Sequence, residues 1–333
     1  MKQTKKITIL HSNDLHGDFL AEQVDEKLVG GVSMLSGYIE KVRAEQPNTI
    51  YVIAGDMFRG SVIDSEYKGL STIEIMNALA PDVVTIGNHE VDYGIAHLLF
   101  IEKCARFPII NANLYIKNTP TRLFTPYKIL RMDGMNILFI GIITQDVINQ
   151  TKSESLVGSF VDTAAAAAEV GKICNAHNSI DIDFTVLLTH IGFEEDKHLA
   201  RQLDPAWGVD LIIGGHPHVV QPARVLMAED GREVPVFYSL GNFLSHQTSP
   251  ENMLGGMASV TICMDETGAY VEDYELLPTI NLITKNPDTG WYNYSPMLLS
   301  DYTPELAATH HIPGCSLDAM QTLFDQIISG TAG

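Results

Sequence analysis

Residues 7–17 read Ile7-Thr8-Ile9-Leu10-His11-Ser12-Asn13-Asp14-Leu15-His16-Gly17, an apolar run followed directly by polar residues. An apolar run without alternation is typical of a strand that is covered on both faces. Asp14 and His16 lie two positions apart, and side chains at such positions of an extended segment point to the same side. The stretch therefore predicts a buried strand whose carboxyl end presents a carboxylate and an imidazole to one metal ion.

The same arrangement recurs after later apolar runs at 50–54, 83–86, 185–188 and 211–213. The ligand-type residues that follow these runs are Asp56, Asn88, His89, His190, His216 and His218. In layered α/β proteins, binding residues gather just past the carboxyl ends of strands. We therefore expect all of these side chains at the same edge of the predicted sheet.

Helical patterns lie between the apolar runs, and strand–helix alternation is typical of an α/β fold with helices on both faces of a sheet. Further strands are expected at 109–113, 137–143 and 236–240. Helices are expected at 32–44, 71–79, 96–105, 163–176 and 194–203. Ser71 is placed to cap the second of these helices.

The chain is expected to divide near residue 280. Two apolar runs at 257–264 and 270–277 flank a short turn and predict a β-hairpin. Beyond Pro278 the pattern becomes a loop rich in Pro, Asn and Tyr. We expect residues 1–280 to form a catalytic domain and residues 281–333 to form a tail with one helix.

Composition excludes some classes of partner. The net charge of −20 argues against general binding to nucleic acid or to an anionic membrane, which would need a basic face. No stretch approaches the ~18 apolar residues of a membrane span, and the apolar run after the basic N-terminus is too short for a signal peptide. The chain is expected to be cytoplasmic as written, or exported if a native leader is missing. The four cysteines are widely spaced and indicate thiols in a reducing compartment.

The mixture of oxygen and nitrogen donors favours Mn, Fe, Zn or Co over Ca or Mg alone. One carboxylate, here Asp56, can bridge two such ions ~3.5–4 Å apart and hold a hydroxide between them. Bound cations also invert the local field, so an anionic substrate can bind despite the acidic chain. Arg59 follows Asp56 by three residues, and it is expected either to reach a substrate phosphate or to form a structural ion pair. Together these residues predict hydrolytic phosphorus chemistry.

The ordered motifs resemble those of the calcineurin-like metallophosphoesterase superfamily. The closer similarity is to the catalytic domain of 5′-nucleotidases and 2′,3′-cyclic phosphodiesterases. It rests on residues 7–17, on Gly55-Asp56-Met57-Phe58-Arg59-Gly60-Ser61 and on Gly87-Asn88-His89-Glu90-Val91-Asp92-Tyr93-Gly94. It covers roughly residues 5–280 and implies a layered metallophosphoesterase-type β-sandwich flanked by helices on both faces.

The resemblance also implies roles for individual residues. One divalent transition-metal ion is expected on Asp14, His16, Asp56 and His218. A second ion is expected on Asp56, Asn88, His190 and His216. His89 and Asn88 are expected to contact the substrate phosphate, and Asp92 is expected to orient His89. A carboxylate partner fixes the tautomer of a histidine and supports its cationic form, which agrees with an acid–base role for that pair.

The expected function is a dinuclear metal-dependent phosphoester hydrolase that acts on nucleotides or related small phosphoesters. Two departures leave other functions open. The 5′-nucleotidases normally carry a second, nucleoside-binding domain, for which too few residues remain here. Residues 214–222 and 238–243 also resemble capsule and poly-γ-glutamate synthesis proteins of the same superfamily. A sulfur-oxidation hydrolase of this superfamily is a further alternative. A non-catalytic metal-binding scaffold is disfavoured, because such proteins lose ligands that are all present here.

Overall fold

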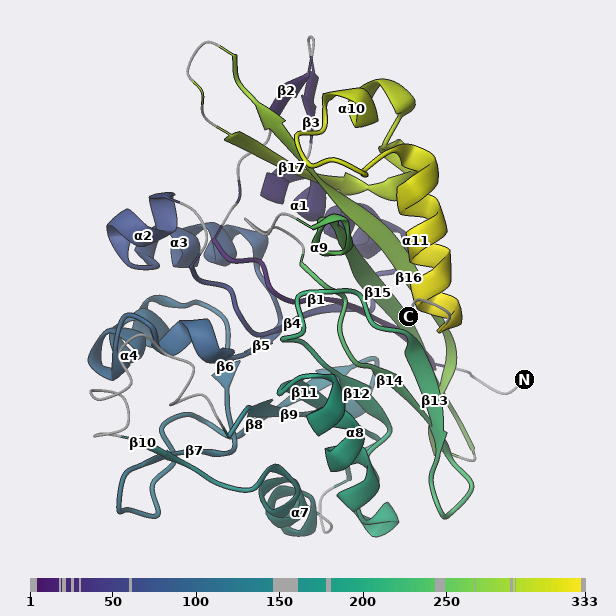
Figure 1. Cartoon of the computed structure of the whole chain (residues 1–333). Coiled ribbons are helices and arrows are strands. Elements are labelled where there is room, and N and C mark those ends of the chain that lie inside the picture. Colours follow the sequence, from purple (N-terminus) through teal and green to yellow (C-terminus); the bar gives the residue numbers. More distant parts are fainter. Residues whose placement is uncertain are drawn as a thin grey trace.

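Two β-sheets form the centre of the molecule, with helices outside them (Figure 1). The computed structural model describes residues 5–17, 19, 22–24, 27–29, 31–59, 62–145, 161–177, 181–242, 249–266, 268–287, 290 and 292–330. The first sheet has the order β17 (Tyr292–Leu298), β16 (Gly268–Lys285), β15 (Leu254–Asp265), β1 (Lys5–Ser12), β4 (Thr49–Ala54), β5 (Val83–Thr85) and β6 (Ile109–Ile110). The second has the order β13 (Ala223–Met227), β14 (Glu233–Phe237), β12 (Leu211–Ile213), β11 (Phe184–His190), β9 (Met135–Ile143) and β8 (Tyr127–Met132). Two small pairs add β2 (Glu22–Val24) with β3 (Lys27–Val29), and β7 (Leu114–Ile116) with β10 (Val161–Thr163).

The inner strands of each sheet run parallel. In the first sheet β1, β4, β5 and β6 are parallel neighbours, and β15 joins β1 antiparallel. In the second sheet β9, β11, β12 and β14 are parallel, with β8 and β13 antiparallel at the edges. Parallel strands place their carboxyl ends at one side, so each sheet presents several strand ends together.

The sheets pack face to face, which makes the fold a β-sandwich. Their shared core includes Ile7 and Ile9 of β1 from the first sheet and Phe139 of β9 from the second. Alternate residues of the same strands face outward, and Leu10 and Tyr51 pack in the core beneath the helices. A strand that is buried on both faces must be apolar throughout, which explains the continuous apolar runs in the sequence.

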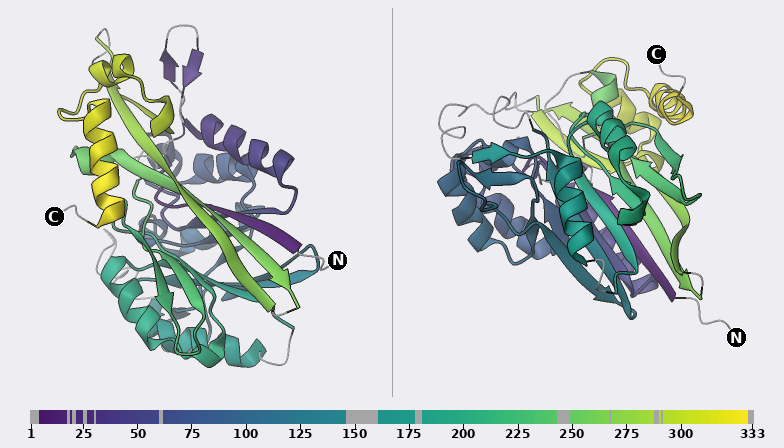
Figure 2. Two further views of the ribbon diagram at one scale, coloured as in Figure 1. Left: turned by 90° about the vertical axis from the view of Figure 1, so that its right-hand side faces the viewer. Right: turned by 90° about the horizontal axis from the view of Figure 1, so that it is seen from below.

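Helices cover the outer face of each sheet (Figures 1 and 2). The first sheet packs against α1 (Gly31–Glu45), α3 (Leu70–Leu79) and α4 (Ile95–Cys104), with α2 (Val62–Tyr67) beside α3. The second packs against α7 (Ala166–His177) and α8 (Phe193–Gln202). In α1 the residues that face the sheet are Leu35, Ile39 and Val42, at the spacing of one helical face. The remaining short elements are the 3-10 helices η1 (Asn88–Val91), η2 (Pro205–Trp207) and η3 (Leu299–Asp301), together with α9 (Pro250–Met253). The fold class predicted from the resemblance is therefore confirmed.

Several predicted boundaries and one predicted cap are wrong. The segment 163–176 divides into a strand that ends at Thr163 and a helix that begins at Ala166. The expected strand at 109–113 stops at Ile110, and the expected strand at 236–240 lies at Glu233–Phe237. Ser71 does not cap α3, whose N-cap is Gly69; its hydroxyl instead donates to the Ile63 carbonyl. Secondary-structure propensity does not predict where these elements begin and end, because hydrogen bonds between different segments of the chain determine it.

The C-terminal segment is more structured than expected. β16 continues through Pro278 to Lys285 and pairs with β17, so a boundary at residue 280 falls within a strand. The described part of this segment holds two helices rather than one, α10 (Pro304–Thr309) and α11 (Leu317–Ser329). Met320, Phe324 and Ile327 of α11 pack with apolar residues of β16 and β17. Figure 2 shows α11 lying along the long strands of the first sheet.

Among the described residues, no helix is long and apolar enough to cross a membrane.

Candidate active site

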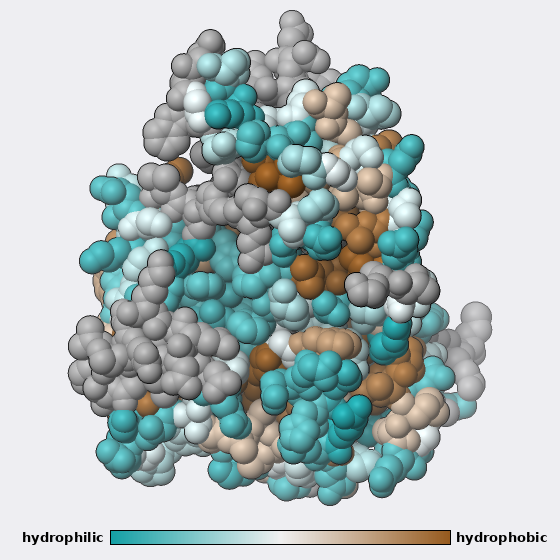
Figure 3. All heavy atoms as spheres, viewed as in Figure 1, coloured by the Kyte–Doolittle hydropathy of each residue, from teal (hydrophilic) through white to brown (hydrophobic). Residues whose placement is uncertain are grey.

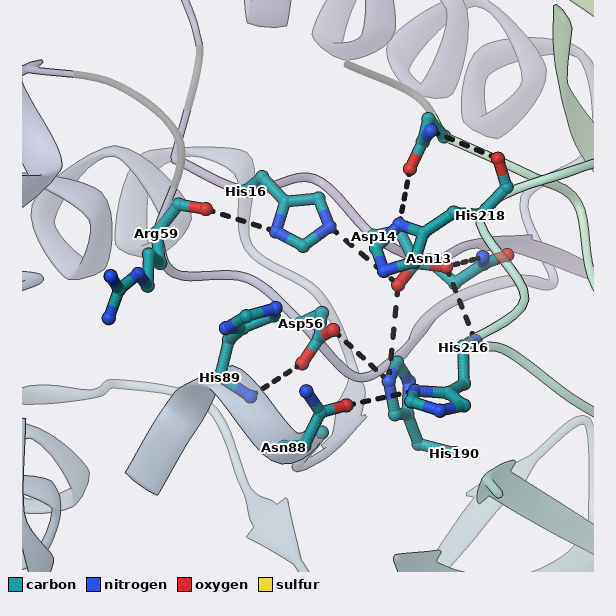
Figure 4. A network of polar contacts seen from close by, with 12 residues as sticks. Asn13, Asp14, His16, Asp56, Arg59, Asn88, His89, His190, His216 and His218 are labelled. Carbon is teal, nitrogen blue, oxygen red and sulfur yellow. Dashed lines mark hydrogen bonds and ion pairs between the residues drawn. The ribbon is translucent and has the colours of Figure 1, made fainter. Parts of the chain in front are cut away.

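The candidate ligands come from the carboxyl ends of strands in both sheets (Figure 4). Asp14 and His16 follow β1, Asp56 follows β4, and Asn88 begins η1 just past β5. His190 is the last residue of β11, and the segment after β12 carries the other two, His216 and His218. The sequence predicted one edge of a single sheet. The structure instead assembles the set where the strand ends of two facing sheets meet.

The ligand-type atoms form two groups that share one carboxylate. Donor atoms of Asp14, His16, Asp56 and His218 all lie within 4.8 Å of one another. Donor atoms of Asp56, His190 and His216 form the second group under the same limit. The Asn88 Oδ1 lies 2.9 Å from His216 Nδ1, at the edge of the second group. These groups coincide with the two sets named from the sequence; that the side chains bind metal stays a prediction.

Four ligand-type atoms in these groups are buried and make no hydrogen bond. They are Asp14 Oδ1, His16 Nε2, Asp56 Oδ2 and His190 Nε2. Only 3.2 Å separates His190 Nε2 from Asp56 Oδ2, and 3.9 Å separates it from Asp14 Oδ1. Buried polar atoms without a hydrogen bond are rare, so four that converge on one place favour a common partner besides these contacts between imidazole and carboxylate. A divalent cation accepts both carboxylate oxygens and imidazole nitrogens and therefore fits the donors that are present.

The backbone is strained at several candidate ligands. Five of them have a positive φ, namely Asp14 (53°), His16 (52°), Asp56 (54°), His216 (96°) and His218 (57°). Non-glycine residues rarely adopt this region, and each instance costs of order 1–3 kcal/mol. The first three also hold a buried atom without a hydrogen bond, and this coincidence indicates a functional constraint rather than a packing accident.

Hydrogen bonds fix the ring orientation of three histidines. His16 Nδ1 lies 3.2 Å from the Phe58 carbonyl and 3.1 Å from the Arg59 carbonyl. His190 Nδ1 lies 2.8 Å from the Ala54 carbonyl, and His218 Nδ1 lies 2.6 Å from Asn242 Oδ1. Because these oxygens are acceptors, each Nδ1 carries a proton, and Nε2 is the nitrogen that faces the other candidate ligands.

Glycines in the motifs make room for the ligands. A Cβ on Gly87 would stand 2.2 Å from Asp56 Oδ1, and a Cβ on Gly55 would stand 2.5 Å from His190 Nδ1. Gly55 also has a φ of +86°. Each glycine therefore lets the backbone approach a candidate ligand as no other residue could.

The predicted acid–base pair is assembled, and Arg59 joins it. Asp92 Oδ2 lies 2.8 Å from His89 Nδ1 and also accepts a 2.8 Å hydrogen bond from Arg59 Nη1. The backbone N–H of His89 donates to Asp56 Oδ1 at 2.9 Å, which ties the pair to the shared carboxylate. Of the two roles expected for Arg59, the structure shows the ion pair.

The electrostatics of the site reflect buried carboxylates beside imidazoles. Burial opposes charge on His89, but the hydrogen bond to Asp92 and the nearby carboxylates raise its pKa above the usual value. Burial also disfavours charge on Asp56, yet His190 holds the pKa of that carboxyl well below its usual range. His16 differs, because burial lowers its pKa to about 4. A neutral imidazole is the form that binds a metal.

The sequence prediction missed residues that support the ligands. Asn13 donates to Asp14 Oδ2 and, at 3.1 Å, to the Gly241 carbonyl. Asn242 accepts the hydrogen bond from His218 and donates in return to the His218 carbonyl at 3.0 Å. Both lie inside motifs that were noted, but their role depends on contacts between distant segments. Nothing in their local spacing could reveal it.

The site elements face the viewer in Figures 1 and 3. Hydrophilic residues gather in the middle of this face, where ends of strands from both sheets meet. Apolar residues lie to one side of this region, near α9 and α11. The surface around the candidate ligands is therefore polar, as a site for an anionic, hydrated substrate requires.

Comparison with known proteins places the chain in a family. Residues 70–247, more than half of the chain, match the family model described as bacterial capsule synthesis protein PGA_cap. Mouse 5′-nucleotidase is 30% identical over 270 residues, which cover 72% of this chain and 46% of that protein. The snake venom 5′-nucleotidase of Gloydius brevicauda is 30% identical over 268 residues, covering 72% and 44%. The chain thus spans about half the length of the curated relatives it matches.

Solved structures agree on the fold. A 5′-nucleotidase precursor from Thermus thermophilus gives a TM-score of 0.68 at 24% identity, covering 82% of this chain and 54% of that one. The calcineurin-like phosphoesterase YfkN from Bacillus subtilis gives a TM-score of 0.65 at 19% identity, covering 99% and 100%. This fold and the clustered donors support binding of divalent metal. The chain is similar to 5′-nucleotidases over part of their length and shares the fold of a calcineurin-like phosphoesterase. It belongs to the family described as bacterial capsule synthesis protein PGA_cap.

Proposed function

We propose that the chain is a metal-dependent phosphohydrolase that acts on nucleotides or related small phosphomonoesters. The observation that carries this proposal is the convergence of two donor groups on Asp56, next to the His89–Asp92 pair. A non-catalytic metal-binding scaffold needs no such pair beside its ligands.

In this proposal two divalent ions bind, one to each donor group, and Mn, Fe, Zn or Co suits the mixed ligands. Asp14, His16, Asp56 and His218 hold one ion, and Asp56, Asn88, His190 and His216 hold the other. When bound, such ions neutralise phosphate charge and lower the pKa of a coordinated water toward ~7.

The remaining chemistry falls to His89 and its partners. Asp92 engages Nδ1, so Nε2 is the nitrogen that can meet a substrate. As water attacks phosphorus and the P–O bond to the leaving group breaks, the imidazolium donates its Nε2 proton to the departing alkoxide. The proton that the attacking water loses passes to solvent, and solvent protonates the imidazole again before the next turnover. Asp92 and Arg59 hold the ring in place, and Asn88 and His89 contact the phosphate oxygens. Removal of a positioned acid of this kind typically costs ~10²–10⁴-fold in rate.

A second candidate function follows from the family match over residues 70–247. The same donors then serve a hydrolase that acts on a capsule-type polymer. In either case we propose that residues 1–280 hold the catalytic site, and that β17 and α11 of the later segment extend and cover the first sheet.

The test is a hydrolysis screen with added Mn²⁺ over nucleoside monophosphates, cyclic nucleotides, simple aryl phosphates and a poly-γ-glutamate polymer. The wild type and Asp56→Asn are compared, each with and without a chelator. Chelator-sensitive phosphate release from small phosphoesters, lost in the variant, is the expected result. Polymer cleavage without phosphate release would favour the second candidate, and no hydrolysis by metal-loaded protein would refute both. Elemental analysis of the loaded protein should give two ions per chain.

A further inference from the structure

The loop after β4, residues 55–59, makes hydrogen bonds on two sides. Its carbonyls face the segment that holds the first two candidate ligands. The N–H groups of Asp14 and His16 donate to the carbonyls of Gly55 and Asp56 at 3.1 and 3.0 Å. The imidazole of His16 reaches the carbonyls of Phe58 and Arg59. The position of this loop therefore decides where two candidate ligands lie, besides that of Asp56 itself.

The N–H groups of the same loop point away from that segment and toward buried carboxylates. Those of Asp56, Met57 and Phe58 donate to Glu90 at 3.0, 2.7 and 3.2 Å. The N–H of Arg59 donates to Asp64 at 2.7 Å. Four consecutive amides of one loop are thus bound by two side chains.

Glu90 has the larger share of these contacts. Its side chain is 1% exposed, and its carboxylate also accepts the N–H of Gly87, at the start of the motif that carries Asn88 and His89. One buried group therefore links the loop after β4 to the loop after β5. A carboxylate that accepts several amide hydrogen bonds is a rigid anchor, because both oxygens are fixed in direction.

We propose that Glu90 is a positioning residue for the metal site: it holds the 55–59 loop in the strained conformation that aims Asp56, Asp14 and His16 at their ions. The inference rests on the proposed metal site but not on the reaction carried out there. Asp56 and Arg59 of this loop both have a positive φ, of 54° and 69°, and non-glycine residues keep such a conformation only where their surroundings hold it. Glu90 is not among the residues expected from the sequence to bind metal or to act as an acid or base.

The test uses Glu90→Gln and Glu90→Asp in the full chain. The first variant keeps the size of the side chain but turns one acceptor oxygen into an NH₂ group, which faces N–H donors. The second keeps the charge but shortens the side chain by one methylene. The matched control is Glu169→Gln. Glu169 is a buried carboxylate on α7 that binds Tyr115, Arg122 and Lys172.

Mn²⁺ affinity is measured by calorimetry, and the melting temperature is recorded for each metal-free variant. Loss of a residue that orients metal ligands typically weakens binding roughly 10–100-fold, and we expect that loss for Glu90→Gln. Glu90→Asp should show a smaller loss of the same sign. Glu169→Gln should lower the melting temperature and leave the Mn²⁺ affinity within about threefold, well under that range.

Wild-type affinity in Glu90→Gln, or an equal loss in Glu169→Gln, would overturn the proposal. The proposal would also be overturned if Glu90→Asp kept the wild-type Mn²⁺ affinity while Glu90→Gln lost it. The charge of residue 90 would then explain the effect without its position. If Glu90→Gln does not fold, Glu90→Asp decides by the same criterion: weakened affinity supports the proposal and wild-type affinity overturns it. A protein that binds Mn²⁺ but hydrolyses nothing would refute the proposed function and leave this inference intact.

Discussion

Addition of Mn²⁺ to the metal-free protein should raise its melting temperature strongly. The four candidate ligand atoms described above make no hydrogen bond and gather at one place, where a cation can bind them together. A cation that satisfies them stabilises the folded state, since the unfolded chain has no assembled site. At 1,000 times the dissociation constant, one site contributes ~4 kcal/mol.

The size of the temperature shift follows from chain length. With ~2.1 cal/mol/K of unfolding entropy per residue, the 333 residues give ~0.7 kcal/mol/K. A stabilisation of ~4 kcal/mol per ion then corresponds to an increase of about 6 °C for one ion and about 12 °C for two. The assay is differential scanning calorimetry of chelated protein over a Mn²⁺ series.

Two variants separate site binding from general attraction of cations to a chain of net charge −20. Asp56→Asn removes the carboxylate that both donor groups share, and its shift should fall below about 2 °C, a third of the shift expected for one ion. Glu194→Gln removes a carboxylate on α8 whose side chain is 76% exposed. This variant should keep the full increase in melting temperature. No shift in the wild type at saturation, or an equal shift in Asp56→Asn, would refute the reasoning.

Three further outcomes are expected. Asp56→Asn should nearly abolish hydrolysis, whereas His89→Asn should keep both metals and lower turnover by ~10²–10⁴-fold; loss of metal in the His89 variant alone would reverse these roles. A generic aryl phosphate should be cleaved within roughly tenfold of the best nucleotide, a difference of ~1.4 kcal/mol in barrier, because the residues proposed to meet the substrate contact its phosphate; a preference of several orders of magnitude would contradict this. Iodoacetamide at pH 8 should label native protein at half-buried Cys104, because the other three thiols are buried and burial raises the pKa of each to about 11; mass spectrometry would show early labelling elsewhere if this is wrong.

The parts of the fold that the sequence predicts well are those set by local pattern. The helix expected at 32–44 is found at Gly31–Glu45, because its apolar residues repeat at helical spacing. The strand at 211–213 is found as predicted, because an isolated apolar run ends at a glycine pair. Positions of candidate ligands follow from the same logic, since each lies just past such a run.

What the sequence cannot supply are contacts between distant segments. The apolar runs do not say which strands share a sheet, so the division into two facing sheets came from the resemblance and not from periodicity. The support that Asn242 gives to His218, 24 positions earlier, depends on that packing. β17 was missed for a related reason: it is held by pairing with β16, and its sequence contains Asn and Pro, which are depleted in strands.

The origin of the candidate ligands in both sheets constrains how the chain can be assembled. Asp14, Asp56 and Asn88 belong to the first part of the chain, and His190, His216 and His218 to a later part. A growing polypeptide cannot bring the two donor groups together until β12 has joined the second sheet and the sheets have docked. Metal capture is then a late event that reports completed folding, and neither half of the chain, expressed alone, should retain a pair of ions. Complementation of the two halves, with metal binding regained on mixing, would be a direct measure of sheet docking.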